Sequence, residues 1–151
     1  MKKGEMLNAM LVLATNKHAG QMDKGGHPYI LHPLAVMTML NSEDEELMCG
    51  AIGHDLIEDT DTTYHELKEA GMTERVVNCI RCLTKLPGET YDEYKAKVKS
   101  NADAVRVKLC DLRHNTDIRR LRGVAEKDIS RMARYFHFYM ELQAIIKEPC
   151  K

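Results

Sequence analysis

Apolar residues recur at the spacing of α-helices along almost the whole chain. From Glu5 to His18, for example, they fall on one face, as in a helix with a buried side. We find no convincing strand pattern, repeat or low-complexity linker. The sequence therefore predicts an all-α fold, a bundle of about eight helices over residues 5–18, 33–40, 42–58, 63–71, 73–83, 91–99, 102–115 and 126–146.

Two of these helices begin at a pattern that is typical of helix N-termini. Ser42 is followed three residues later by Glu45, and Thr63 is followed in the same way by Glu66. In such a capping box the hydroxyl and the carboxylate each bind a backbone N–H that the helix leaves without a partner. We therefore expect Ser42 and Thr63 to be N-cap residues.

Residues 20–28 interrupt the helical pattern with three glycines and a proline, which predicts a loop whose backbone can approach a ligand. Pro33 suits the first turn of the next helix, where its missing N–H is not needed. The residue before a proline is biased toward an extended conformation. His32 should therefore lie at the mouth of that helix.

Length and charge narrow the class of protein. A chain of 151 residues is the size of one domain, so we expect a single domain over residues 1–151. The 22 Lys and Arg residues nearly balance the 23 Asp and Glu residues, which gives no overall attraction to nucleic acid or membrane. No apolar run could span a bilayer, and most of the five cysteines lie in apolar helical patterns, as reduced thiols do. These features predict a cytoplasmic protein that binds neither nucleic acid nor membrane. They do not decide whether the chain forms a homo-oligomer.

His54 and Asp55 are adjacent within an otherwise apolar helical stretch. Burying two ionisable side chains without partners would cost several kcal/mol. A divalent cation compensates both, because its charge keeps the aspartate ionised and the histidine neutral. Two adjacent ligands are too few, but His32 and Asp111 lie in similarly apolar surroundings. The sequence thus predicts a metal site formed by His32, His54, Asp55 and Asp111.

Two nitrogen and two oxygen ligands leave positions for water on a six-coordinate ion, as a hydrolase requires. Mn²⁺ or Fe²⁺ suits this set better than a metal that prefers thiolates. Glu58 and Asp59 follow His54 and Asp55 by one helical turn, so we expect both on the same face as the ligands. There a carboxylate can take or give a proton, and Asn115, four residues after Asp111, should also point toward the site.

Other interpretations of the same residues are open. Taken alone, His54 would usually be a buried core histidine, and residues 58–61 an ordinary acidic helix end. The chain could also be a regulator that keeps the pocket only to sense a ligand, or a structural helical module. The combination with His32 and Asp111 favours the metal site. The remaining histidines are interpreted as structural or surface residues: His18, His27, His65, His114 and His137.

Three segments resemble the signature blocks of the HD superfamily, specifically the hydrolase domain of Rel/SpoT-type alarmone enzymes and their small stand-alone relatives: residues 18–33 (HAGQMDKGGHPYILHP), 53–60 (GHDLIEDT) and 107–115 (VKLCDLRHN). The resemblance extends from about residue 5 to residue 145. It implies an HD-domain helical bundle and an enzyme of the stringent response that removes pyrophosphate from the 3′ position of ppGpp. Some small relatives are linked instead to removal of phosphate from NADPH.

The same resemblance implies roles for individual residues. His32, His54, Asp55 and Asp111 match the four ligands of a manganese ion. Glu58 and Asp59 match the catalytic acidic pair, and Asn115 matches a residue that contacts the nucleotide. Lys24 is expected to meet a phosphate. The partner is therefore a small-molecule nucleotide substrate.

Two positions depart from the family pattern. The loop carries Asp23 and Lys24 where the family often has an arginine followed by a lysine, and Ile118 occupies a position that is often threonine. A carboxylate neither stacks on a purine nor neutralises a phosphate. We therefore expect weak guanine preference, and expect Asp23→Arg to strengthen binding of ppGpp.

Overall fold

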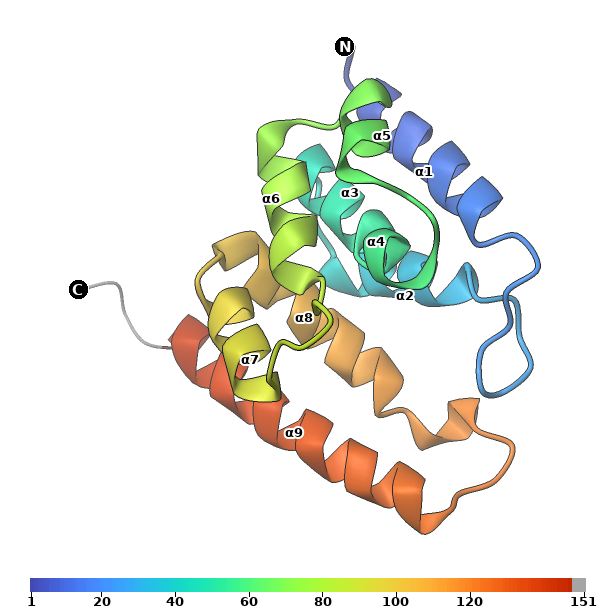
Figure 1. Ribbon diagram of the computed structural model, residues 1–151, viewed down its shortest axis with the longest axis vertical. Coiled ribbons are helices and arrows are strands. Elements are labelled where there is room, and N and C mark those ends of the chain that lie inside the picture. Colours follow the sequence, from blue (N-terminus) through green and yellow to red (C-terminus); the bar gives the residue numbers. More distant parts are fainter. Residues whose placement is uncertain (148–151) are drawn as a thin grey trace.

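The computed structural model describes residues 1–147, and apart from one isolated β-bridge between Met22 and Pro28 the regular elements in this range are all helices, which confirms the all-α prediction (Figure 1). Nine α-helices and one 3₁₀ helix occur in this range, because the structure divides one of the eight predicted helices into two. In chain order they are α1 (Glu5–Lys17), α2 (Leu31–Leu40), α3 (Glu45–Gly53), α4 (Leu56–Asp59), α5 (Tyr64–Glu69), α6 (Glu74–Leu83), α7 (Tyr91–Lys99), α8 (Ala102–Asn115), η1 (Ile118–Arg120) and α9 (Glu126–Lys147).

One of the two predicted capping boxes is present. The Thr63 side chain accepts a hydrogen bond from the Glu66 backbone N–H, and Glu66 reaches back to the N–H of Thr63, so that α5 begins as expected. The prediction at Ser42 was wrong. Asp44 caps α3 by accepting from the two backbone N–H groups at positions 46 and 47, while Ser42 accepts from the N–H of Asp44. A carboxylate at the N-terminus also complements the helix dipole.

The predicted helix over residues 42–58 is broken in the middle. α3 ends at Gly53, a turn holds His54 and Asp55, and α4 follows as a single turn. The His54 ring lies 2.6 Å from the backbone oxygen of Ala51, and this side-chain contact competes with the regular helical pattern. The doublet therefore lies at a junction between helices and not on a continuous helix face.

The position of His32 also differs from the prediction. α2 already begins at Leu31, so His32 and Pro33 both lie in its first turn. Pro33 fits there as expected, because the first N–H groups of a helix have no partner within it. The tendency of a residue before proline to be extended is overridden here. His32 is consequently held by helical backbone and is almost fully buried.

Helix α3 lies at the centre of the domain and packs against α1, α2, α6 and α8. Two apolar clusters flank it. One is formed with α1, α5 and α6, and the other surrounds α8 together with α2, α7 and α9. α9 runs along the outer side of α8 (Figure 1). The ends of α2 and α3 and the buried side of α8 therefore meet between the two clusters.

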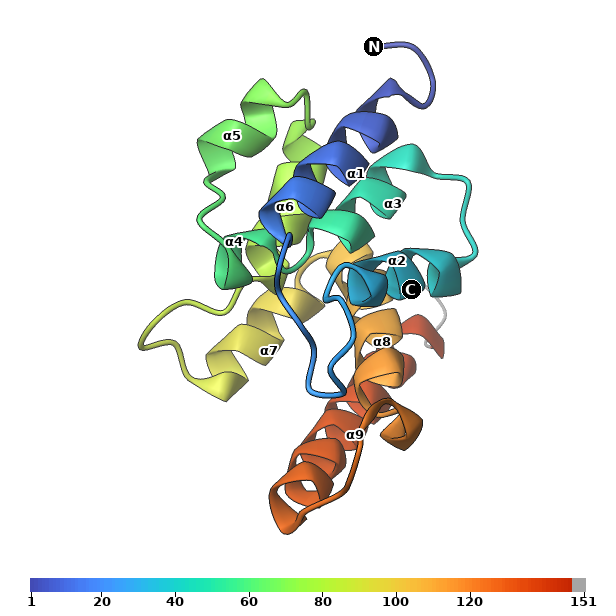
Figure 2. The ribbon, with the colours of Figure 1, turned by 90° about the vertical axis from the view of Figure 1, so that its right-hand side faces the viewer.

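The loop over residues 20–28 folds against the segment around η1 (Figure 2). Gly25 has no room for a side chain, since a Cβ atom there would lie 2.1 Å from the backbone oxygen of Arg120. The Arg122 guanidinium donates from Nε to the backbone oxygen of Gly25 at 2.8 Å. The loop and the segment around η1 thus form one continuous wall.

Among residues 1–147, no helix is both long and apolar enough to cross a membrane. The four cysteines in this range are free thiols, as the sequence predicts, and Cys150 lies outside the described residues.

Candidate active site

The four predicted metal ligands converge although they come from three separate segments. His32 belongs to α2, His54 and Asp55 to the turn after α3, and Asp111 to α8. His32 Nε2 lies 2.9 Å from Asp111 Oδ1 and 3.6 Å from Asp55 Oδ2. His54 Nε2 lies 3.0 Å from Asp55 Oδ2 and 3.5 Å from Asp111 Oδ1. Two imidazole nitrogens and two carboxylate oxygens therefore face one another around one point.

The His54 ring shows that this set fits a cation. Its Nδ1 faces the backbone oxygen of Ala51, which can only accept, so this nitrogen carries the proton. In the neutral ring Nε2 then has a lone pair that points toward two carboxylate oxygens. Nε2 is buried and makes no hydrogen bond to any residue between 1 and 147. A positive charge between these atoms would remove the repulsion, and a divalent ion does so with the ring neutral.

Neighbouring side chains hold the two carboxylates in place. The Tyr29 hydroxyl donates to Asp55 Oδ2 at 2.6 Å. Lys108 donates to Asp111 Oδ2 at 2.6 Å, and the Asn115 amide donates to Asp111 Oδ1 at 2.7 Å. Burial by itself would raise the pKa of Asp111, but the Lys108 ammonium together with the side chains of His32 and His54 outweighs burial and holds that pKa well below its usual range. Asp111 is therefore an anion that is fixed in orientation.

His32 is oriented by another histidine. Its Nδ1 lies 2.7 Å from Nδ1 of His114, and the two rings stack with centroids 5.0 Å apart. Burial, followed by the charge of Arg120, lowers the pKa of His114 to about 4, so that this ring is neutral and can accept. His32 then donates from Nδ1 and presents its Nε2 lone pair to the carboxylates. Such outer hydrogen bonds fix the tautomer of a histidine ligand.

Glu58 and Asp59 lie on the single turn of α4, next to the cluster. Asp59 Oδ2 accepts a weak hydrogen bond from Tyr29, and Glu58 accepts one from the backbone N–H of Lys85. Burial, and then repulsion by Asp55, raises the pKa of Asp59; burial is also the main cause of the raised pKa of Glu58. A carboxylate with a raised pKa is a better proton acceptor near neutral pH.

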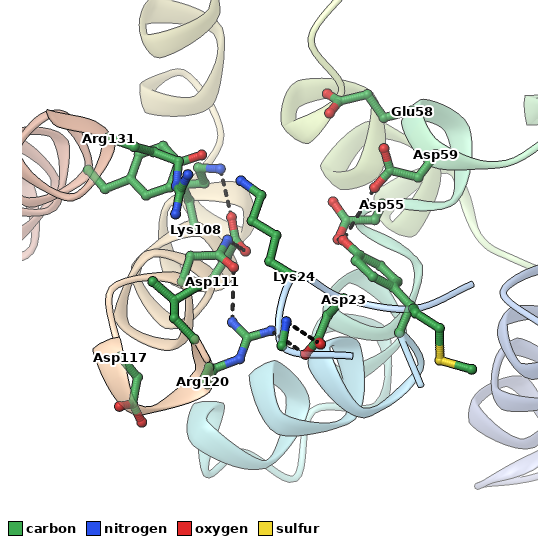
Figure 3. Close-up of a pocket in the computed structure, with 16 residues that line it drawn as sticks. Asp23, Lys24, Asp55, Glu58, Asp59, Lys108, Asp111, Asp117, Arg120 and Arg131 are labelled. Carbon is green, nitrogen blue, oxygen red and sulfur yellow. Dashed lines mark hydrogen bonds and ion pairs between the residues drawn. The ribbon is translucent and has the colours of Figure 1, made fainter. Parts of the chain in front are cut away.

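Asp55, Asp111, Glu58 and Asp59 line a cavity of about 470 Å³ that has an acidic and a basic side. Asp55, Glu58 and Asp59 lie on one side, and Lys24, Lys108 and Arg131 lie on the other (Figure 3). Lys24 comes from the loop over residues 20–28 and Arg131 from α9. A phosphate in this cavity would therefore meet cations opposite the carboxylates.

Asp23 has a structural role in this wall. Its Oδ1 accepts hydrogen bonds from the backbone N–H groups of Gly25 and His27, at 2.9 and 2.8 Å, and so closes the loop. Its Oδ2 lies 3.5 Å from Arg120 Nη2. Arg120 also donates to the Asn115 side-chain oxygen at 3.2 Å. Asp23 is thus a loop-forming residue paired with a cation and not a carboxylate free to repel a ligand.

The sequence analysis missed several residues that contact the predicted ligands. Lys108 precedes Asp111 by three residues on α8, and this helical spacing could have identified it. Tyr29 lies in the turn before α2 and contacts Asp55, which is distant in sequence, so no local spacing indicates it. His114 was interpreted as a structural or surface residue, although it touches His32. Arg131 and Tyr135, which also line the cavity, carry no local pattern, because α9 reaches the cavity only through tertiary packing.

The chain is similar in sequence to enzymes of alarmone metabolism, although no protein-family model matches it. It is 38% identical over 111 residues to a guanosine-3′,5′-bis(diphosphate) 3′-pyrophosphohydrolase of Aquifex aeolicus, which covers 69% of the chain and 16% of that relative. It is 30% identical over 127 residues to the bifunctional (p)ppGpp synthase/hydrolase SpoT of Escherichia coli, which covers 72% of the chain and 17% of SpoT. The chain thus spans about a sixth of the length of these curated relatives.

A solved structure gives the same fold over nearly the whole chain. It is of a protein described as a metazoan ortholog of SpoT that hydrolyzes ppGpp, and it matches with a TM-score of 0.73 at 24% identity. The match covers 97% of this chain and 88% of that one. Sequence and fold agree, and the chain belongs to the HD superfamily as a Rel/SpoT-type domain.

Proposed function

We propose that this chain is a metal-dependent phosphohydrolase that removes pyrophosphate from the 3′ position of guanosine 3′,5′-bis(diphosphate). The observation that carries the proposal is the Nε2 atom of His54, which is buried without a hydrogen bond between the carboxylates of Asp55 and Asp111. The names of the curated relatives support the choice of substrate.

Three of the predicted ligands, His32, His54 and Asp55, offer ligand atoms that all lie within 4.8 Å of one another, and Asp111 Oδ1 lies 2.9 Å from His32 Nε2. We propose Mn²⁺, with Fe²⁺ as the alternative, because imidazole and carboxylate ligands together suit these metals. His32, His54, Asp55 and Asp111 would hold it. Such an ion supplies Lewis acidity to a phosphoryl oxygen and to the attacking water. Because the ligands are themselves held by hydrogen bonds, they would fix the ion at one place beside the cavity.

Side chains of the protein would carry out the proton transfers and bind the substrate. Glu58 or Asp59 takes the proton of the attacking water or returns one to the leaving oxygen, since both carboxylates line the cavity. Lys24 neutralises phosphate charge from the opposite wall. Asn115 is held by Asp111 and Arg120, so its contact with a nucleotide would use the face of the amide that these bonds leave open.

The proposal is tested by loading the purified chain with Mn²⁺ and offering ppGpp, NADPH and a panel of nucleotides, with released pyrophosphate and phosphate measured separately. Pyrophosphate from ppGpp is the expected product. Phosphate from NADPH alone would show a different substrate, and turnover of neither with retained nucleotide binding would show a sensing domain. A cytoplasmic location and a single domain over residues 1–151 stay predictions.

A further inference from the structure

A second cavity adjoins the one that holds the predicted ligands. Its volume is about 410 Å³, and it is lined by the segment after η1 and by the first turns of α9. Lys24 and Arg131 line both cavities, so a ligand in one can continue into the other. Of the three residues that line both cavities, Lys24 and Arg131 are cations and the third is Leu121. The second cavity therefore extends the basic side of the first.

The charge of this second cavity is strongly unbalanced. Four cations line it, Lys24, Arg122, Lys127 and Arg131, against one carboxylate, Asp128. Asp128 is already engaged, because it accepts from the backbone N–H of Ala125 and from Arg131, both at 2.9 Å.

Two of the cations have no acidic partner. Arg122 and Lys127 take part in no ion pair within residues 1–147, whereas Lys17, Lys68 and Lys95 elsewhere on the surface are all paired. Burial, and then repulsion by Arg131, lowers the pKa of Lys24. A cluster of cations with one engaged carboxylate attracts an anion of more than one charge.

Arg122 is held in place before any ligand binds. Its Nε donates to the backbone oxygen of Gly25, and the guanidinium lies against Gly26, where a Cβ atom would come within 2.4 Å of Nη2. Gly26 leaves room for the guanidinium, and its φ of +81° is one that favours glycine. The remaining N–H groups of the guanidinium are free for a phosphate, and a fixed guanidinium loses little entropy when it binds one.

We propose that this second cavity binds the 5′-phosphate chain of the nucleotide whose 3′-phosphates lie at the His/Asp cluster. The inference rests on the proposed function: a guanosine 3′,5′-bis(diphosphate) carries two phosphate chains, and only one can lie beside Glu58 and Asp59. The other chain leaves the first cavity past Lys24 and Arg131. There it meets Arg122 and Lys127.

The test compares Lys127→Ala with the wild type on two substrates, ppGpp and guanosine 3′-diphosphate, which lacks the 5′-phosphates. Lys127 is exposed and unpaired, so its removal leaves the fold intact. We expect KM for ppGpp to rise about fivefold with kcat unchanged, and KM for guanosine 3′-diphosphate to stay constant. Lys127→Arg should restore KM. Arg134→Ala is the matched control, because Arg134 is an exposed cation of α9 that lines neither cavity.

An unchanged KM for ppGpp, or an equal rise for both substrates, overturns the inference. If the wild type hydrolyses neither substrate, the proposed function fails, and calorimetry with GDP then decides the question, because GDP carries only the 5′ chain. About fivefold weaker binding of GDP to Lys127→Ala upholds the second cavity. Equal binding by both proteins, or no binding to the wild type, overturns it.

Discussion

The cluster of predicted ligands and the basic wall formed by Lys24, Arg122 and Lys127 lie at two adjoining cavities and are built differently. His32, His54 and Asp111 are 2–3% exposed, and each is held by a hydrogen bond to a neighbouring group of the protein. Lys24, Arg122 and Lys127 are exposed and lie on loops or on the first turn of α9. A change in the cluster leaves buried polar groups without partners, whereas a change in the wall is absorbed by water. We therefore expect changes in the cluster to affect the proposed reaction itself and changes in the wall to affect substrate preference.

The largest effect is expected from Asp55→Ala or His54→Ala. Each change removes a ligand from the same site, so bound metal and hydrolysis should be lost together. Elemental analysis of the purified variants beside an activity assay provides the measurement. A variant that is free of metal but fully active would contradict the metal site, and with it the distinction between the two regions.

A change beside the cluster should affect turnover without removing the metal. Glu58→Gln keeps the shape of the side chain but cannot accept a proton, and we expect kcat to fall by about a hundredfold, the usual size of general acid–base catalysis. Metal content should match the wild type. If the metal is lost, Glu58 is a ligand and belongs to the cluster itself.

The pH profile gives a second check on Glu58. Its pKa is raised by burial above the ordinary value of 4.5, and a base must be deprotonated to act. Activity should therefore be full above this raised pKa and fall as the pH drops through it. In Glu58→Gln this acid limb of kcat/KM should move or disappear. An unchanged limb would point to Asp59 as the base.

A smaller effect is expected where His114 orients His32. His114→Phe keeps an aromatic ring against His32 but removes the acceptor for its Nδ1–H, so we expect metal affinity to fall by roughly tenfold. Competition with a chelator measures this. Arg113→Ala, an exposed neighbour on α8, serves as the control and should bind metal as the wild type does. Equal affinity in His114→Phe would mean that the helical backbone alone positions His32.

The smallest effect concerns the basic wall and the base of the nucleotide. Asp23 closes the loop and pairs with Arg120. The side chain at position 23 is therefore a carboxylate that is already engaged, and no guanidinium is present there to stack on guanine. We expect guanine and adenine forms of a 3′-phosphorylated nucleotide to differ by less than about tenfold in kcat/KM, which is about 1.4 kcal/mol. Strong selectivity for guanine would show that another residue of the wall recognises the base.

The structure changes how position 23 should be tested. Asp23→Asn keeps an oxygen for the N–H groups of Gly25 and His27 and removes only the charge that faces Arg120. It should lower KM for ppGpp a few-fold. Asp23→Arg, which the sequence favoured, loses both loop hydrogen bonds and would confound binding with loop structure. A rise in KM for Asp23→Asn would mean that the pair with Arg120 itself positions the substrate.

Most helices could be predicted from the sequence because their determinants are local. Apolar spacing and caps place α8 and α9 within about a residue of their observed ends, and Thr63 begins α5 as expected. The errors occurred where side chains that are distant in sequence compete with local preference. The turn at His54 and the helical conformation of His32 both accompany contacts around Asp55 and Asp111, which local patterns cannot describe.

The sequence by itself determined the residue types of the candidate site, because buried His and Asp in apolar stretches need compensation wherever they fold. It also determined that the domain is helical, since apolar periodicity is a local property. Only the tertiary structure decided which groups surround the site. It brought Tyr29 onto Asp55, His114 onto His32 and Arg131 of α9 into the cavity, and it paired Asp23 with Arg120. The physical reason is that ligand identity follows from the chemistry of single residues, whereas orientation, charge balance and pKa depend on neighbours that only packing brings together.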